Sequence, residues 1–377
     1  MSLPLRRATF YLAFGSAASI LFSIAISQIL LGLSLASLLL SGQPLRFPPL
    51  RAPLALFFGI TVIAVLASGD PRAGTPQIRK FFVFAMLLVV FSAFETVKQV
   101  RALLFCWAGV GLCSALQGIA QFLHRRHEEN SYAYLLDGRI TGFASHWMTF
   151  GGEEMIVLSM LAGFVLFSRG PAVKIFGWPV VGILLTGVTL GMTRCIFLLG
   201  VPCGLTYLLW QRRRILVVGA AAVALAGGAV VPRAIRERAI SVFQPHGRSD
   251  SSAHRAMCRL VGWQMIKAHP WLGLGPEQIA KQFDRYVPAA VPRPLPRGWY
   301  GHLHNVCLQY AAERGIFALL CILWLIAKAA RDFLKYLRHP ALDPEVKAVL
   351  HGAIAVTIAI LAEGLFEYNL GDRKSVV

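Results

Sequence analysis

Long apolar runs without charged residues, separated by short polar segments, dominate the chain. These runs cover residues 8–40, 54–67, 81–91, 102–122, 155–167, 175–191 and 215–231. A helix needs about 20 apolar residues to cross a bilayer, so the pattern predicts an all-α polytopic membrane protein. We expect about 11 transmembrane helices: nine before residue 232, one over residues 304–327 and one over residues 348–366.

The first run, residues 8–40, is too long for a single crossing. We expect two helices joined by a tight turn near residues 26–28. The run also continues well past the apolar core of a signal peptide and lacks a clear cleavage site, so a secretory leader is not expected.

Basic residues indicate how the helices are oriented. The chain has 37 Lys and Arg against 18 Asp and Glu, a net charge of +19, and 56% of its residues are hydrophobic. Cytoplasmic loops of membrane proteins are enriched in Lys and Arg, and "QRRR" at 211–214 is the strongest such anchor. This places the N-terminus in the cytoplasm, although residues 68–80, expected as an outer loop, also carry three basic residues.

The orientation divides the chain into three parts: nine helices in residues 1–231, an extramembrane segment in residues 232–303, and two final helices in residues 304–377. The extramembrane segment contains "SSAHRAMCRLVGWQMIKAHP", which is patterned as an amphipathic helix. It carries eleven Lys and Arg against four acidic residues. Long translocated segments escape the positive-inside rule, so this excess indicates an anionic ligand at the outer surface. Attraction to anionic lipid headgroups is the alternative.

The stretch "GHLHNVCLQYAAERG" at 301–315 opens a predicted membrane helix with polar residues. On a helix starting near His304, the residues Asn305, Gln309 and Glu313 form one stripe, which we expect to face the bundle interior. The positive end of the helix dipole disfavours imidazolium at His304, and a general base requires a neutral imidazole. The alternative is a histidine that only caps the helix. Gly315 is expected to permit close helix packing.

We predict no metal ligands. His302 and His304 could form a pair, but the sequence shows no carboxylate or cysteine partner nearby. The seven cysteines lie mostly in apolar runs and form no CxxC motif, which is typical of small packing residues.

Two isolated arginines are expected on the same outer face as His304. Arg194 lies at a predicted junction of two helices, and Arg255 begins the amphipathic helix. Arginine is suited to phosphate because its planar fork donates two parallel hydrogen bonds and stays charged. The alternatives are a headgroup anchor for Arg194 and simple solvation for Arg255.

Together these stretches resemble the O-antigen ligases and the related O-antigen polymerases. The resemblance rests on "TRCIFL" (193–198), "HRAMCRLVGWQMIKAHPWLGLGP" (254–276), and His304-Asn305 followed by Gly315, with "GRITGFASHWMTFGG" (138–152) and "EGLFEYNLGD" (363–372) also similar. The motifs are short, but their order and the long outer segment extend the resemblance over nearly the whole chain.

The resemblance implies a GT-C-type helical bundle in the bacterial inner membrane, usually of about 12 helices, with its active site facing the periplasm. The implied reaction moves a glycan from an undecaprenyl-pyrophosphate donor to a sugar hydroxyl of lipid A–core, with inversion at the anomeric carbon. It requires neither metal nor cofactor. The expected partners are these two substrates and membrane lipids, and no nucleic acid.

The resemblance also implies residue roles. His304 is the expected general base, and Arg194 and Arg255 the ligands of the diphosphate. Substrate binding is expected of Arg139, His146, Arg259, Asn305, Gln309 and Tyr300. Arg259 competes with Arg255 for the second phosphate role.

The sequence departs from the family pattern at two places. Cys195-Ile196-Phe197 replaces the usual Gly-Ala-Trp after Arg194, and "RKSVV" follows Asp372 where family members continue into a last helix. We therefore expect either a truncated protein or one that works with eleven helices and an outside C-terminus.

Other functions remain open. An O-antigen polymerase or a protein O-oligosaccharyltransferase would use the same scaffold with another acceptor. A transporter would more often show internal repeats and helices broken at mid-membrane, and we find no such repeat.

Overall fold

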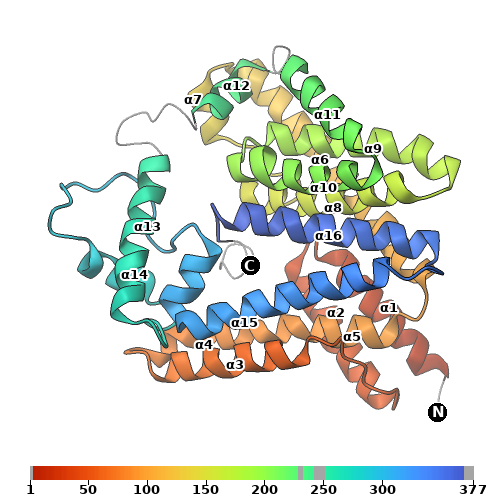
Figure 1. Cartoon of the computed structure of the whole chain (residues 1–377), viewed down its shortest axis with the longest axis horizontal. Coiled ribbons are helices and arrows are strands. Elements are labelled where there is room, and N and C mark those ends of the chain that lie inside the picture. Colours follow the sequence, from red (N-terminus) through yellow and green to blue (C-terminus); the bar gives the residue numbers. More distant parts are fainter. Residues whose placement is uncertain (1–2, 228–231, 242–250, 369–377) are drawn as a thin grey trace.

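The fold is that of a computed structural model, which describes residues 3–227, 232–241 and 251–368. Within these ranges the elements are helices and connecting turns, without a strand, and the predicted all-α class is confirmed. The long helices run side by side, and α13 and α14 gather at one end of the bundle, with α13 lying across it (Figure 1). The chain end "RKSVV" and part of "EGLFEYNLGD" lie outside the described residues.

The helices follow the apolar runs. The first part of the chain contains α1 (Leu3–Ser19), α2 (Ile24–Leu40), α3 (Arg51–Leu66), α4 (Pro71–Arg79), the 3-10 turn η1 (Lys80–Phe84), α5 (Ala85–Ala93), α6 (Val97–Glu128), α7 (Tyr132–Asp137), α8 (Trp147–Phe167) and α9 (Pro171–Leu190). Then follow the π-helical turn η2 (Ile196–Gly200), α10 (Val201–Arg212), α11 (Arg214–Gly227), α12 (Arg233–Ile240), α13 (Ser251–Ala268), α14 (Ile279–Gln282), η4 (Phe283–Tyr286), α15 (Val306–Leu337) and α16 (Pro344–Gly364).

Within the described residues, five helices are long and apolar enough to cross a membrane: Pro71–Ala93, Val97–Glu128, Trp147–Phe167, Pro171–Leu190 and Pro344–Gly364. Shorter apolar helices accompany them, among them Ile24–Leu40 and Arg51–Leu66. The chain is therefore a multi-pass membrane protein. The count of eleven crossings, the orientation and the three-part division stay predictions.

The predicted hairpin in the first run is confirmed, but its turn lies at residues 20–23 and not at 26–28. Ser23 begins α2 because its hydroxyl accepts a hydrogen bond from the Ile26 amide. Ser16 and Ser27 then donate to each other's carbonyl oxygens at 2.7 and 2.8 Å, which joins α1 to α2. These serines, rather than the apolar pattern, decide where the chain reverses.

The expected loop at residues 68–80 is wrong, because most of it is the helix α4. Asp70 caps this helix by accepting a hydrogen bond from the Ala73 amide, and Pro71 occupies the first turn. An N-cap aspartate followed by proline is a strong helix start. Helix α4 runs through η1 into α5 as one candidate crossing.

Helix α8 lies at the centre of the main core. It packs against α6, α9, α10 and α16. Its buried face contributes Met155, Leu158 and Leu161 to the largest hydrophobic cluster. This core fixes the ends of α9 and α16, from which site residues project.

Helix α15 begins at Val306, two residues later than expected, and is broken at Gly315, where φ is +77°. The break receives the "HPWLGLG" loop: the Ile316 amide donates to the Pro270 carbonyl, and Leu274 and Gly275 donate to the carbonyls of Ala312 and Glu313. A Cβ atom on Gly315 would lie 1.8 Å from the Trp271 carbonyl oxygen. Gly315 therefore admits a loop of the extramembrane segment, and not a neighbouring helix as expected.

The segment of residues 232–303, predicted to be extramembrane and called the extramembrane segment below, has a core of its own against α15. The predicted amphipathic helix is α13, and its residues Cys258, Val261 and Met265 are buried with Leu303 and Ala312. The segment is thus a folded part of the protein, which holds α13 close to the start of α15.

Candidate active site

Four side chains form the histidine–glutamate cluster: His254 on α13, His302 and His304 before α15, and Glu367 after α16. His304 has a left-handed backbone (φ +50°) just before the helix that Asn305 caps. Its Nδ1 lies 2.8 Å from Glu367 Oε1. Because a carboxylate only accepts hydrogen bonds, His304 donates through Nδ1, so in the neutral form of the imidazole Nε2 is the nitrogen without a proton.

Glu367 is buried among cations and hydrogen-bond donors. Arg255 Nη2 lies 3.1 Å from Glu367 Oε2, and His302 Nε2 lies 3.8 Å from Oε1. Burial alone would raise the pKa of Glu367, but the hydrogen bond from His304 and the charges of His304, Arg255 and His302 lower the pKa to about 2. The carboxylate therefore stays ionised at physiological pH.

His254 faces the other side of His304. The two Nε2 atoms are 3.3 Å apart, and the Tyr300 ring lies 4.4 Å from the His254 ring. Burial, followed by the charge of His304, lowers the pKa of His254 to about 4, so His254 is neutral. Tyr300 donates its hydroxyl to the Pro296 carbonyl, so it supports the loop over His254.

Arginines gather beside this cluster. Burial, followed by the charges of Arg238 and Arg255, lowers the pKa of Arg139 to about 10. Arg194 is buried just after the turn that ends α9 and donates to the Ser241 hydroxyl at 3.1 Å. Arg238 donates to the Met192 carbonyl in that same turn. We call Arg139, Arg194, Arg238 and Arg255 the arginine group.

The two groups of residues share one region. Cys195, which follows Arg194, lies within electrostatic reach of Arg139, Arg255 and Glu367. The structure thus brings the three predicted catalytic residues, His304, Arg194 and Arg255, to the same end of the bundle. Such a concentration of guanidinium groups favours the binding of a multiply charged anion.

The polar stripe on α15 has structural bonds. Asn305 caps the helix through the Leu308 amide and donates to the Leu365 carbonyl at 2.8 Å. Gln309 accepts from the Leu303 amide, and Glu313 accepts from the Glu277 amide. Asn305, Gln309 and Glu313 thus hold the segments before α15 and after α16; substrate binding by Asn305 and Gln309 stays a prediction.

The other predicted substrate-binding residues, His146, Arg139 and Arg259, lie in different places. His146 caps α8 through the Met148 amide, and its ring contacts the Trp147 ring at a tilt of 33°, with the ring centroids 3.8 Å apart. The Arg139 guanidinium lies over the same indole at 4.0 Å. Arg259 is exposed on α13, whereas Arg255 contacts Glu367, and a phosphate role for either arginine stays a prediction.

A comparison with protein families gives a match in the region that contains this candidate site. Residues 178–323 match the family described as O-antigen ligase. This part of the chain is therefore similar to the O-antigen ligases. It covers Arg194, Arg255 and His304. A comparison with curated proteins gives no match.

The family resemblance inferred from the sequence is therefore confirmed over residues 178–323, and the match supports an O-antigen ligase or polymerase type of function. The matched segment ends before Glu367, which completes the histidine–glutamate cluster. A lipid-linked glycan is the kind of substrate that this family implies.

Sequence reasoning did not assign Glu367, His254 or Arg238 to this candidate site. Glu363 and Glu367 stand four residues apart at the end of an apolar run, and acids there are rare enough to mark a site. His254 and Cys258 share the same spacing on α13. Nothing in the sequence distinguishes Arg238, because it is one of several arginines in a short polar helix.

The reason given for excluding His302 as a metal ligand is wrong. The sequence neighbourhood lacks a carboxylate, but folding brings Glu367 to 3.8 Å from His302 Nε2. Partners supplied by distant segments cannot be seen from local spacing.

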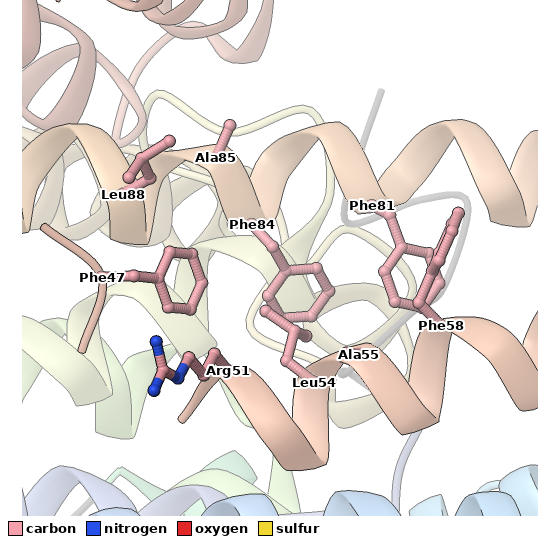
Figure 2. Close-up of a pocket in the computed structure, with 9 residues that line it drawn as sticks. All are labelled: Phe47, Arg51, Leu54, Ala55, Phe58, Phe81, Phe84, Ala85 and Leu88. Carbon is pink, nitrogen blue, oxygen red and sulfur yellow. The ribbon is translucent and has the colours of Figure 1, made fainter. Parts of the chain in front are cut away.

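A pocket of about 370 Å³ lies away from this chemistry, between α3 and the η1–α5 segment (Figure 2). It is lined by apolar side chains, including Phe47, Phe58 and Phe84, with Arg51 at one end. Its lining offers no nucleophile, acid or base, so the histidine–glutamate cluster is the better candidate for catalysis.

Proposed function

We propose that the protein transfers a glycan from undecaprenyl pyrophosphate to a sugar hydroxyl of lipid A–core, at the periplasmic face of the bacterial inner membrane. The observation that carries this proposal is the hydrogen bond between His304 Nδ1 and the ionised Glu367. It orients the imidazole, with Nε2 directed away from the carboxylate, beside a group of arginines, as base-catalysed transfer from a diphosphate requires.

His304 acts as the general base. The acceptor hydroxyl replaces His254 as the hydrogen-bond partner of His304 Nε2, which removes the hydroxyl proton as oxygen attacks the anomeric carbon. The imidazolium that forms is stabilised by Glu367, which already accepts from Nδ1. Direct attack inverts the configuration at that carbon.

The arginine group stabilises the leaving diphosphate. Bond cleavage leaves negative charge on the diphosphate oxygens, and guanidinium groups fixed in advance stabilise it without reorganisation. Arg194 is held by Ser241, and Arg255 is held by Glu367, so both are oriented before substrate arrives. With this much positive charge from side chains, the proposed reaction needs no metal.

Arg139 and His146 border the substrate on the other side. Their contacts with Trp147 give a partly cationic surface, which is suited to a sugar face or a phosphate. Tyr300, Asn305 and Gln309 act mainly by shaping the loops around His304.

The direct test is His304→Ala in a strain that lacks its own ligase. We expect loss of at least about 100-fold in transfer, because general bases contribute that much or more. The readout is the lipopolysaccharide ladder, with insertion of the variant checked in isolated membranes. His339→Ala, at an exposed position between α15 and α16, is the matched control and should keep the ladder.

A ladder of near wild-type intensity with His304→Ala would show that His304 is not the base. Wild-type protein that lengthens free lipid-linked glycan, but leaves lipid A–core bare, would indicate the polymerase instead.

A further inference from the structure

Three potential metal-ligand atoms meet on the side of His304 that faces α13. His254 Nε2 lies 3.3 Å from His304 Nε2, and Cys258 Sγ lies 3.7 Å from His254 Nε2. All three atoms lie within 4.8 Å of one another. Because Glu367 fixes the hydrogen of His304 on Nδ1, the His304 Nε2 lone pair points away from Glu367 and is available.

The spacing suits a tetrahedral cation. With metal–nitrogen bonds of about 2.05 Å and a metal–sulfur bond of about 2.3 Å, tetrahedral angles place two nitrogens about 3.3 Å apart and nitrogen and sulfur about 3.6 Å apart. In the structure the two imidazole nitrogens are 3.3 Å apart, and His254 Nε2 lies 3.7 Å from Cys258 Sγ. His254 and Cys258 are separated by four residues on α13, so both project from one face of that helix.

The surroundings restrict which cation can bind. Arg255 and the carboxylate of Glu367 are both close enough to Cys258 and His254 to act on them, so charge alone does not select the cation. The three ligand atoms include no oxygen, which disfavours Mg²⁺ and Ca²⁺, because both prefer oxygen ligands. Two imidazoles and a thiolate instead favour Zn²⁺ and Cd²⁺.

We propose that His254, Cys258 and His304 form a binding site for a thiophilic divalent cation such as Zn²⁺, and that the bound cation inhibits the protein. The metal forms one bond to sulfur and one to each Nε2, and the thiol proton is released to solvent. His254 and Cys258 are buried and His304 is partly exposed, so the cation enters from the His304 side. A metal bound to His304 Nε2 occupies the lone pair that would take the proton from the sugar hydroxyl. The proposed inhibition therefore rests on the proposed function.

Metal binding can be tested without any activity. The full-length protein, purified in detergent and freed of metal, is titrated with Co²⁺ as a spectroscopic probe. We expect a thiolate-to-cobalt charge-transfer band in the near ultraviolet and the visible bands of tetrahedral cobalt, both abolished by Zn²⁺. Cys258→Ser should lose the charge-transfer band, and His254→Gln should weaken cobalt binding by at least about tenfold.

Cys106→Ser, on α6, is the matched control and should keep both bands. All variants are compared by gel filtration, so that a misfolded variant is recognised. A wild-type protein without the charge-transfer band, or an unchanged band in Cys258→Ser, would overturn the site.

Inhibition is measured separately, as the Zn²⁺ concentration that halves glycan transfer relative to each variant's own metal-free rate. We expect Cys258→Ser to need at least about tenfold more Zn²⁺, and a chelator to restore the wild-type rate. Cobalt binding at these ligands without inhibition by Zn²⁺ would overturn the inhibitory part alone. The cobalt spectra do not depend on glycan transfer. Failure of the proposed function and failure of the metal site can therefore be distinguished.

Discussion

Glu367 determines how His304 is held. One carboxylate oxygen accepts a hydrogen bond from His304 Nδ1, and the other accepts one from Arg255. A single acid thus links the proposed base to the proposed phosphate ligand. Glu313, equally buried, instead accepts from the Glu277 backbone and lies beside Arg314. Two acids of similar burial thus differ in role because their partners differ.

Glu367→Gln should lower the turnover of glycan transfer by at least about tenfold while changing KM for the donor much less. The amide keeps the size of the side chain but removes the charge that stabilises the imidazolium on His304. Initial rates of purified protein over a range of pH measure the effect, and the pH profile of turnover should shift, which a merely structural role would not produce. Glu367→Asp should recover part of the rate. An unaltered rate and pH profile in Glu367→Gln would rule out this positioning role.

Arg194→Lys should reduce transfer by about tenfold or more, because one ammonium group cannot reproduce two parallel hydrogen bonds to a diphosphate. The lysine would also lose the geometry of the bond to Ser241. Transfer rates in membranes measure the effect, and Arg212→Lys in the "QRRR" anchor serves as the control. Full activity of Arg194→Lys would leave Arg194 as a structural anchor only.

At the scale of elements, the break in α15 connects the membrane bundle to the extramembrane segment. A break in a helix leaves backbone groups without partners, and here the "HPWLGLG" loop supplies them through three backbone hydrogen bonds. Nearby, Gln77 on α4 accepts from Arg314 and donates to Glu277, so α4 joins the same contact. The loop and the two helices form one rigid support below His304.

Gly315→Ala should destabilise this support by about 1–3 kcal/mol, since the residue combines a φ of +77° with a Cβ position 1.8 Å from the Trp271 carbonyl oxygen. The expected result is a lower melting temperature of the purified protein and reduced transfer. Gly59→Ala on α3 is the matched control, because a Cβ there meets nothing within 4 Å. Equal melting temperatures for the two variants would contradict the proposed packing.

At the scale of the whole molecule, the sequence predicts those features that depend on local pattern. Apolar runs gave the helices, and the amphipathic pattern gave α13. The turn at Ser23 and the helix α4 were missed because capping by Ser23 and Asp70 outweighs hydropathy. His304 was found because a polar residue beside an apolar run is conspicuous, whereas its partners Glu367 and His254 come from segments that only folding brings together.

The orientation of the whole bundle can be tested with single added cysteines. Arg259→Cys lies on exposed α13 and should react with a membrane-impermeant maleimide in spheroplasts. Arg213→Cys, in the predicted cytoplasmic anchor, should react only after the membrane is opened. Labelling above the wild-type background is the measurement, and the opposite pattern would reverse the predicted orientation.

The joint between the "HPWLGLG" loop and α15 consists of main-chain atoms. Hydrogen bonds between main-chain atoms require glycine where a Cβ would clash, as at Gly315, and depend less on the identity of the surrounding side chains. The surface of the extramembrane segment can therefore change, by substitution or by exchange of loops between relatives, while the height of His304 above the membrane helix is preserved. Engineering of acceptor preference in this protein should begin on that surface, with the joint left untouched.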